Sequence, residues 1–326
     1  MCTYFQNPSL ISVCVITYNS SKFVVETLES AKSQTYDNIE LIISDDCSTD
    51  NTIEICREWI KKHEGRFKRV KLITVEKNTG IASNCNRVVK AANGDWIKLI
   101  AGDDMLLENC VLDNINYVNE NPEPVVAIHS NMNVYNDNFQ SENFKVIDDY
   151  SNFEINRSDI NASQQFALLL RNGLSGAPTF FIKKSLISDL GGYDELMPYE
   201  DWPFFLIVTQ KGNKIHYLNK VTVNYRVHNM SIYNSGLSEK IIFNDFFIKE
   251  KLIYDKYRKN HLTMAERMIE EIEFKRKYYF LKFGFNKDTS LNKWLNKVSL
   301  FIYSYLKRKA FVITNKDKIL NKNGEN

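Results

Sequence analysis

Long apolar runs are missing from this sequence. No stretch approaches the roughly 18 consecutive apolar residues that a membrane-spanning helix needs, and the amino terminus, MCTYFQNPSL, has no basic start followed by an apolar run. A secretory signal peptide requires both of these features. We therefore expect neither export nor membrane spanning, and we predict a cytoplasmic protein.

Cysteine is also scarce, with six residues in a chain of 326. The cysteines stand singly, without a CxxC pair and without the spacing of a disulfide framework. A reducing compartment fits this usage. The six are Cys2, Cys14, Cys47, Cys56, Cys85 and Cys110.

Several catalytic and nucleotide-binding motifs are absent. No G-x-x-x-x-G-K-[ST] occurs, and no G-x-G-x-x-G follows the first apolar segment, which disfavours P-loop and NAD chemistry. Neither G-x-S-x-G nor H-E-x-x-H is present, so hydrolase elbows and zinc-protease helices also lack support.

The net charge is small in total but unevenly distributed. The formal charge is +2, whereas residues 271–326 hold 13 Lys and Arg against 5 Asp and Glu, a net of +8. The first 270 residues therefore carry −6. An acidic body argues against nucleic acid as a partner.

Apolar and polar residues alternate as strands and helices through the first hundred residues. Near-continuously apolar strands separated by helices predict a parallel sheet that is buried on both faces and has right-handed crossovers. The fold class is therefore α/β with a Rossmann-like first half. We expect strands at residues 11–16, 39–44, 70–75 and 96–101, and helices at 21–34, 52–61 and 81–92.

The pattern becomes less regular after Asn121-Pro122. Residues 136–161 are rich in Asn, Asp and Ser, which indicates an insertion on the substrate side. Pro203 suits the first position of a helix that runs to about residue 211. We further expect a less regular stretch at 125–135, strands at 178–182 and 221–227, a helix at 164–170, and mostly helix beyond residue 235.

Polar residues follow three of the predicted strands. Ligands bind at the carboxyl ends of the strands in an open parallel sheet. Carboxylates gathered at one edge repel one another unless a cation or hydrogen-bond donors are supplied, and a divalent metal with a nucleotide would supply both. The strand ends are Thr17-Tyr18-Asn19, Asp45-Asp46-Cys47-Ser48 and Gly102-Asp103-Asp104.

Each of these carboxylates has a local alternative. Asp104 could cap a helix that begins near Met105, or it could bind Mg²⁺ or Mn²⁺ with Asp103, since such ions take one or two carboxylates together with phosphate oxygens. Asp46 could form an Asx turn before Ser48, or it could accept hydrogen bonds from a base or ribose.

Four segments in this order resemble family 2 inverting glycosyltransferases of the GT-A fold. The resemblance spans residues 10–231. It implies a nucleotide-binding half at about 10–104 and an acceptor half at about 105–235 of a catalytic domain over 1–235, followed by a helical, basic and aromatic region at 236–326. The segments are ISVCVITYNSSKFVVETLESAKSQTYDNIELIISDDCSTDNTIEI, NTGIASNCNRVVKAANGDWIKLIAGDDM, GGYDELMPYEDWPFF and NYRVHN.

The resemblance also implies roles for individual residues. Asp103 matches the principal Mn²⁺ or Mg²⁺ ligand of the D-x-D region, with Asp104 beside it. The sequence departs from the family pattern at Ala101, which replaces the first aspartate, and at Cys85, which replaces an Arg. The implied base-and-ribose pocket consists of Thr17, Tyr18, Asp46 and Asn86, and the implied nucleotide-binding set also includes Asn19 and Asp103.

The Glu200-Asp201 pair matches the catalytic motif of the family. Asp201 corresponds to the general base, which must reach the acceptor hydroxyl in a single displacement with inversion. A helix amino terminus at Pro203 would keep Asp201 ionised, although Asp is also an ordinary helix-start residue. Trp202 could stack on the acceptor sugar or belong to the core.

Two further residues are candidate contacts to the metal or the diphosphate. His228 follows the last strand, where the family places a histidine near the metal, although a lone histidine after a strand can also be structural. Arg226 is a second cationic candidate, because negative charge develops on the departing diphosphate.

The basic end of the chain interleaves cations with aromatic residues. This end could lie on an anionic membrane surface without crossing it, at the inner face of the plasma membrane, or it could pack on the catalytic body. The apolar residues at helical spacing are Leu291, Trp294, Leu295, Val298, Ile302 and Tyr305.

Together these features predict an inverting glycosyltransferase. We expect the donor to be a nucleotide sugar, specifically a UDP-sugar. We expect the acceptor to be a glycan or lipid-linked oligosaccharide in surface polysaccharide or O-antigen type biosynthesis. A sugar nucleotidyltransferase is the alternative enzyme, although its Gly- and Lys/Arg-rich triphosphate loop is replaced here by Tyr18-Asn19-Ser20-Ser21. A catalytically silent nucleotide-sugar-binding module is the other alternative.

Overall fold

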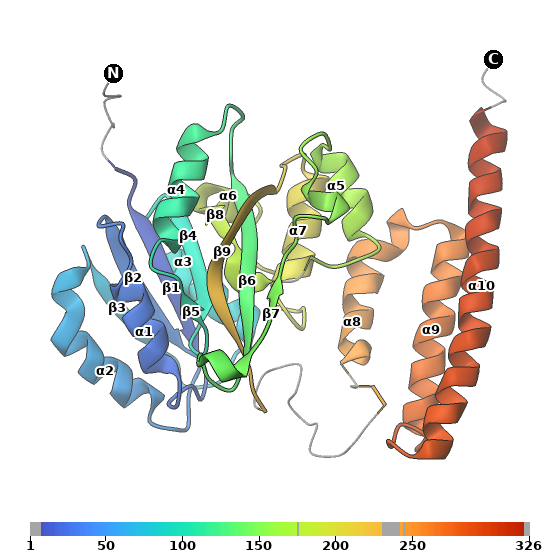
Figure 1. The fold of residues 1–326 in the computed structure, drawn as a ribbon, viewed down its shortest axis with the longest axis horizontal. Coiled ribbons are helices and arrows are strands. Elements are labelled where there is room, and N and C mark those ends of the chain that lie inside the picture. Colours follow the sequence, from blue (N-terminus) through green and yellow to red (C-terminus); the bar gives the residue numbers. More distant parts are fainter. Residues whose placement is uncertain (1–7, 175, 230–241, 244–245, 323–326) are drawn as a thin grey trace. The chain divides into compact units, whose positions relative to one another are not determined.

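The computed structural model describes residues 8–174, 176–229, 242–243 and 246–322, with side chains described up to residue 309. The chain divides into two compact units, Met1–Val227 and His228–Asn326. The domain boundary predicted at residue 235 lies outside the described residues. Figure 1 shows the first unit as a sheet with helices on both faces, and the second as helices.

Strand and helix alternate in the first hundred residues, as the sequence predicts. The apolar strands are buried throughout at β1 and β2. The observed elements are β1 (Ile11–Thr17), α1 (Val24–Lys32), β2 (Ile39–Asp45), α2 (Thr52–His63), β3 (Val70–Thr74), α3 (Ile81–Ala91) and β4 (Trp96–Ala101).

The described strands form a sheet in the order β3-β2-β1-β4-β8-β6-β9-β5, with β7 paired to β6. The first four strands are all parallel. The second half is mixed, because β8 runs antiparallel to both β4 and β6 whereas β6 and β9 are parallel. Its strands are β5 (Met105–Leu106), β6 (Ala127–Asn136), β7 (Phe144–Asp148), β8 (Phe181–Lys183) and β9 (His216–Val227).

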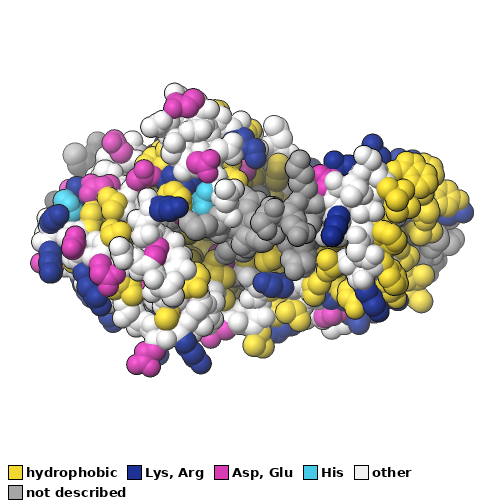
Figure 2. All heavy atoms as spheres, turned by 90° about the horizontal axis from the view of Figure 1, so that it is seen from below, with side chains coloured by type: hydrophobic (Ala, Val, Ile, Leu, Met, Phe, Trp, Pro, Cys, Tyr) yellow, Lys and Arg dark blue, Asp and Glu magenta, His cyan; other side chains and the backbone are white. Residues whose placement is uncertain are grey.

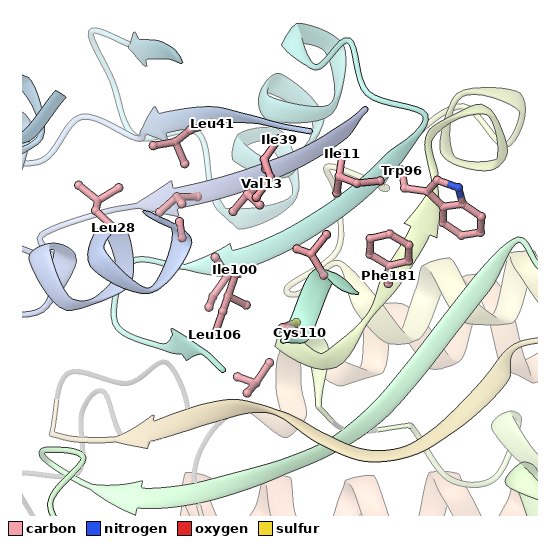
Figure 3. Close-up of a cluster of buried hydrophobic side chains, with 14 of the residues drawn as sticks. Ile11, Val13, Leu28, Ile39, Leu41, Trp96, Ile100, Leu106, Cys110 and Phe181 are labelled. Carbon is pink, nitrogen blue, oxygen red and sulfur yellow. The ribbon is translucent and has the colours of Figure 1, made fainter. Parts of the chain in front are cut away.

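Both faces of the parallel half are covered by helices. On one face of the sheet, buried residues of β1 and β2 form a core cluster with apolar residues of α1, α2 and α4 (Cys110–Glu120). Figure 3 shows part of this cluster, with Leu28 of α1 beside Val13 and Leu41. On the other face, α3 contacts β1 and β2.

The turn from α3 into β4 lies close to the first strand. A Cβ atom on Gly94 would lie 2.6 Å from Ser12 Oγ and 2.7 Å from the carbonyl oxygen of Leu10. Only glycine therefore allows this backbone contact. The contact sets the register in which β4 joins β1, where Ile11 lies opposite Trp96.

Three local predictions need correction. No helix begins near Met105, because residues 105–106 form β5 against β9 and α4 begins only at Cys110. The helix predicted to start at Pro203 begins at Asp201, so Pro203 is its third residue, where a missing N–H still costs no helical hydrogen bond. The polar stretch 136–161 is not irregular throughout, since it contains β7.

Further helices lie in the second half of the first unit, and the described part of the second unit is helical. The first set is α5 (Ala162–Leu169), α6 (Lys184–Asp189) and α7 (Asp201–Gln210). The helices of the second unit are α8 (Phe247–Ile253), α9 (Met264–Lys282) and α10 (Ser290–Lys322). Within the described residues, none of the helices combines the length and the apolar character needed to cross a membrane.

Candidate active site

The carboxyl ends of β1, β2 and β4 meet at one edge of the sheet. Thr17 pairs with Asp45 across β1 and β2, and Ile16 pairs with Ala101 across β1 and β4. The backbone N–H of Gly102 donates to the Ile16 carbonyl at 2.9 Å. Asp46 and Asp103 therefore leave the same edge from strands two positions apart, about 10 Å in a sheet with ordinary strand spacing.

The loops after β1 and β2 are joined by hydrogen bonds. Thr17 Oγ1 donates to Asp45 Oδ2 at 2.8 Å, and the N–H of Thr49 donates to Asn19 Oδ1 at 2.8 Å. Asn19 has a φ of 52°, a left-handed conformation that Asn tolerates better than most residues. Tyr18 stays 50% exposed at this edge, so its ring is open to a ligand.

Asp46 is buried and holds the loop before α3. Its carboxylate accepts hydrogen bonds from the N–H groups of Thr79 and Gly80 at 2.9 and 2.8 Å. The Asx-turn interpretation of Asp46 is wrong, because its neighbour Asp45 accepts the N–H of Ser48 at 2.8 Å.

Sequence reasoning missed the cation beside Asp46. Arg87 of α3 makes an ion pair with Asp46 at 2.6 Å and donates to Ser44 Oγ at 3.1 Å. The family pattern directed attention to position 85, where the chain has a buried cysteine. The Arg two residues later reaches the end of β2 and so balances a carboxylate that is only 2% exposed.

Asn86 connects α3 to the segment that precedes α7. Its amide donates to the Tyr193 carbonyl at 2.9 Å and accepts the Tyr193 N–H at 2.8 Å. Gly192, at φ +84°, lies so close that a Cβ there would be 2.6 Å from Asn86 Oδ1. The structure thus gives this side chain backbone partners in the second half of the unit, which the sequence did not suggest.

Asp103 and Asp104 form a turn that is fixed on several sides. Asp104 is 2% exposed, and its Oδ1 accepts the backbone N–H of Arg226 at 2.9 Å. Thr27 Oγ1 donates to the Asp104 carbonyl at 2.6 Å. The predicted helix-cap role of Asp104 is wrong, since a strand follows it.

The two aspartates of this turn differ in their surroundings. Asp103 is only partly buried, whereas burial, and next the charge of Asp103, raise the pKa of Asp104 well above its usual range. Asp104 thus anchors the turn, and Asp103 is the carboxylate that is left partly exposed at the sheet edge.

Arg226 supports this turn from β9. Its Nε donates to the Asp103 carbonyl at 2.7 Å, and its Nη1 donates to the Asp137 carbonyl at 2.5 Å. The guanidinium also pairs with Glu26 and lies 4.0 Å from the centre of the Phe139 ring. With 2% exposure, Arg226 is a buried clamp rather than an open cation that could meet a diphosphate.

Glu200 and Asp201 lie at the amino terminus of α7, against β4. With apolar residues that include Ile97 and Leu99, they line a cavity of about 10 Å³, room for about one water molecule. Burial, and next the charge of Asp201, raise the pKa of Glu200 to about 8. Burial raises the pKa of Asp201 to about 6, although the Trp202 N–H donates to its Oδ1 at 2.6 Å.

This outcome differs from the expected effect of the helix terminus. The helix amino terminus was predicted to keep Asp201 ionised. Burial has the larger effect, so the pKa of Asp201 moves toward neutrality while Asp201 remains mostly ionised at pH 7. A carboxylate with a pKa near the working pH suits proton transfer.

Trp202 is held by the end of α5 and the segment that follows it. Its indole N–H donates to the Leu169 carbonyl at 2.8 Å, and a Cβ on Gly173 would lie 3.3 Å from its ring. The side chain is half-buried. These contacts fix the ring and leave part of it accessible.

His228 is the first residue of the second unit and is 8% exposed. Its predicted role as a metal ligand stays a prediction. No group of three or more His, Cys, Asp or Glu side chains in the described residues is arranged to hold a metal ion.

The sequence matches a protein family and several known proteins. A family model described as "Glycosyl transferase family 2" matches residues 12–177. WfaP of Escherichia coli, a "UDP-Glc:alpha-D-GlcNAc-diphosphoundecaprenol beta-1,3-glucosyltransferase", is 28% identical over 239 residues, which cover 71% of this chain and 83% of WfaP. Coverage differs among relatives, since the chain spans 91% of the length of one and 38% of another.

Two solved structures share the fold. S. aureus TarS 1–349 in complex with UDP-GlcNAc has a TM-score of 0.58 at 20% identity, covering 91% of this chain and 81% of that chain. The mannosyltransferase PcManGT from Pyrobaculum calidifontis, in complex with GDP-Man and Mn²⁺, has a TM-score of 0.51 at 17% identity, covering 69% and 59%. The expected fold class is thus confirmed.

Proposed function

The chain belongs to glycosyl transferase family 2, and from this premise we propose that it moves a sugar from a UDP-sugar to a glycan hydroxyl with inversion at the anomeric carbon. The observation that carries the proposal is the placement of the Asp201 carboxylate. It lies at the start of α7 against Leu99 of β4, the strand whose end carries Asp103. The carboxylate proposed as the base and the carboxylate proposed to bind the cation thus lie beside the same strand.

The donor nucleotide is assigned to the edge formed by β1 and β2. Tyr18 offers an exposed ring for stacking on the base. Asp46 and Arg87 support the loop at Thr79 and Gly80, which lies beside this edge. The names of WfaP and TarS, which involve UDP-glucose and UDP-GlcNAc, favour uridine as the base.

A divalent cation, Mn²⁺ or Mg²⁺, is proposed to bind at Asp103. The donor set fits, because Asp103 supplies a hard carboxylate oxygen and such ions commonly take one or two carboxylates with diphosphate oxygens. Asp104 and His228 are the further ligands that the family resemblance implies. When bound, the cation would neutralise charge on the diphosphate. The Mn²⁺ in the PcManGT complex supports this assignment.

Transfer is proposed to proceed in one displacement. Asp201 removes the proton of the acceptor hydroxyl as its oxygen forms a bond to the anomeric carbon, and the bond from that carbon to the diphosphate oxygen breaks with its electron pair leaving on the diphosphate. The configuration therefore inverts. Glu200, the neighbouring carboxyl, holds a proton near neutral pH and so leaves Asp201 as the ionised member of the pair.

The acceptor is proposed to be a glycan on a lipid carrier. Trp202, fixed by Leu169 and half-buried, offers an aromatic surface for the acceptor sugar. The acceptor in the name of WfaP is a diphosphoundecaprenol-linked sugar, which supports a role in O-antigen or surface polysaccharide biosynthesis. Such a reaction would take place at the inner face of the plasma membrane, where the protein would bind peripherally.

The donor assignment is tested by measuring turnover of a panel of UDP-, GDP-, ADP- and dTDP-sugars with Mn²⁺ present. We expect one or more UDP-sugars to be consumed with release of UDP. A dependence on a sugar phosphate plus a nucleoside triphosphate, with release of pyrophosphate, would favour a sugar nucleotidyltransferase. Binding of a nucleotide sugar without turnover of any sugar in the panel would favour a catalytically silent binding module.

The pH dependence of transfer follows from the pKa of Asp201. Because the base must be ionised and its pKa is about 6, kcat/KM should fall about tenfold for each pH unit below 6 and level off above it. The measurement is the initial rate between pH 4.5 and 8.5 at low acceptor concentration, with UDP affinity followed as the control. A flat profile through pH 6 with unchanged UDP affinity would contradict Asp201 as the base.

A further inference from the structure

Polar side chains take part in the contact between α9 and α10. Arg276 of α9 donates from Nη1 to Asn296 Oδ1 at 2.6 Å and to Ser299 Oγ at 3.1 Å, both on α10. The same guanidinium is held by Glu273 at 2.7 and 2.8 Å. Side chains that would ordinarily face water thus lie in the contact between the two helices.

The opposite side of α10 is apolar and exposed. The exposed fraction reaches 76% at Phe301, 63% at Leu291 and 59% at Trp294. Their positions fall within an arc of about 100° on a helix with 3.6 residues per turn, the width of a core-facing stripe. The exposed stripe consists of Leu291, Trp294, Val298, Phe301, Ile302 and Tyr305.

The apolar residues of α10 are divided between its two sides, because Leu295, Tyr303 and Leu306 are half-buried whereas the stripe is exposed. A helix in a water-soluble protein turns its apolar stripe toward its neighbour and its polar side to solvent. Contiguous exposed apolar surface on this scale marks an interaction surface. Figure 2 shows hydrophobic side chains gathered over this unit, with Lys and Arg among them.

The Lys and Arg residues near the exposed stripe indicate what kind of partner covers it. From Lys275 to Lys309 the chain has ten Lys and Arg and one acidic residue, Asp288, which pairs with Lys293 at 2.6 Å. Exposed Lys297 and Arg308 lie along one border of the stripe. Lys is depleted in protein interfaces, whereas long cationic side chains beside apolar and aromatic residues suit the headgroup level of an anionic bilayer.

We propose that the outer face of α10 lies in the surface of an anionic membrane, with the stripe in the acyl boundary and the cations at the phosphates. The choice of membrane leaflet rests on the proposed function, because a lipid-linked acceptor is reached at such a surface. It also explains why polar groups meet between α9 and α10: in this orientation the apolar side needs no protein partner.

Vesicle binding of the full chain tests this proposal without any glycosyl transfer. Vesicles of phosphatidylcholine with about one third phosphatidylglycerol should co-sediment the protein at low salt, with roughly fivefold weaker binding for each Lys→Gln change at Lys293 or Lys297. Trp294 is the most exposed of the four tryptophans, so its emission should shift to the blue and be quenched by brominated acyl chains. Pure phosphatidylcholine should bind far less.

A double variant, Phe301→Ser with Ile302→Ser, isolates the apolar part. Both side chains are exposed, so the fold should persist, and vesicle affinity should fall about tenfold or more while UDP-sugar hydrolysis is unchanged. Leu196→Ser, at the same 76% exposure as Phe301 but in the first unit, is the matched control and should bind vesicles normally.

Two results would overturn the membrane assignment. Vesicle binding of the double variant equal to that of the unchanged chain would show that the stripe is not inserted. A dimer that dissociates in the double variant, together with no vesicle binding by the unchanged chain, would assign the stripe to a second copy. A failure of glycosyl transfer alone, with vesicle binding intact, would instead count against the proposed function.

Discussion

Replacing Asp201 with Asn is expected to lower the rate of glycosyl transfer by about a thousandfold, the usual contribution of a general base. Asn has nearly the same shape and can still accept the Trp202 N–H at the start of α7. It cannot take the proton of the acceptor hydroxyl. The loss should therefore appear in kcat, measured with saturating donor and acceptor, while the affinity for UDP stays within about twofold of the unchanged enzyme.

A matched control separates this effect from the loss of any carboxylate in the region. Asp189→Asn makes the same chemical change at an exposed position at the end of α6, outside the candidate site, and should leave transfer unchanged. The pH profile gives a second check, because the transition near pH 6 should vanish from the residual activity of Asp201→Asn. Near-normal transfer by this variant would remove Asp201 from the role of base.

The parallel half of the fold could be predicted from sequence because each strand there is a short apolar run. The limits of β4 were predicted without error, and those of β1 and β2 to within one residue. The second half was harder, since strand β5 has only two residues and exists through pairing with β9. Local pattern does not encode a pairing between residues about 120 positions apart.

The candidate site shows the same division. The sheet edge that carries Asp46 and Asp103 follows from where the strands end, so it could be predicted from the sequence. The hydrogen-bond partners of residues at the site could not be predicted in this way. Arg87 at Asp46, Asn86 at Tyr193 and Arg226 at Asp103 are contacts between side chains and distant loops, and each depends on the completed packing.

Those missed contacts share one consequence for the site. Arg226 and Asn86 both join the nucleotide-binding half, residues 10–104, to later segments, one at the turn of Asp103 and the other at the segment leading to Glu200 and Asp201. The backbone at Asp103 and the segment that leads to Asp201 are therefore each held by part-buried hydrogen bonds, the first to Arg226 of β9 and the second to Asn86 of α3. Preorganisation of this kind suits a reaction that needs the donor and acceptor groups aligned.

The second large effect is expected from Asp103→Asn. If Asp103 binds the divalent cation that holds the diphosphate, the neutral Asn should weaken Mn²⁺-dependent UDP binding by about tenfold or more and lower transfer by roughly a hundredfold. The substitution should spare the fold, because Arg226 holds this turn through the backbone carbonyl of residue 103, which the substitution leaves in place. Titration of UDP by calorimetry, with Mn²⁺ and with a chelator, gives the measurement.

The comparison of the two metal conditions decides the role of Asp103. In the unchanged enzyme Mn²⁺ should strengthen UDP binding, and in Asp103→Asn this gain should disappear, so that both conditions give the weak affinity. Asp95→Asn, an exposed carboxyl beside the opposite end of β4, should keep the full gain and serves as control. Asp201→Asn should also keep the gain in UDP affinity that Mn²⁺ provides. A variant that loses transfer but keeps this gain therefore reports on the base, and a variant that loses both reports on the metal. An undiminished gain in Asp103→Asn would place the cation on other residues.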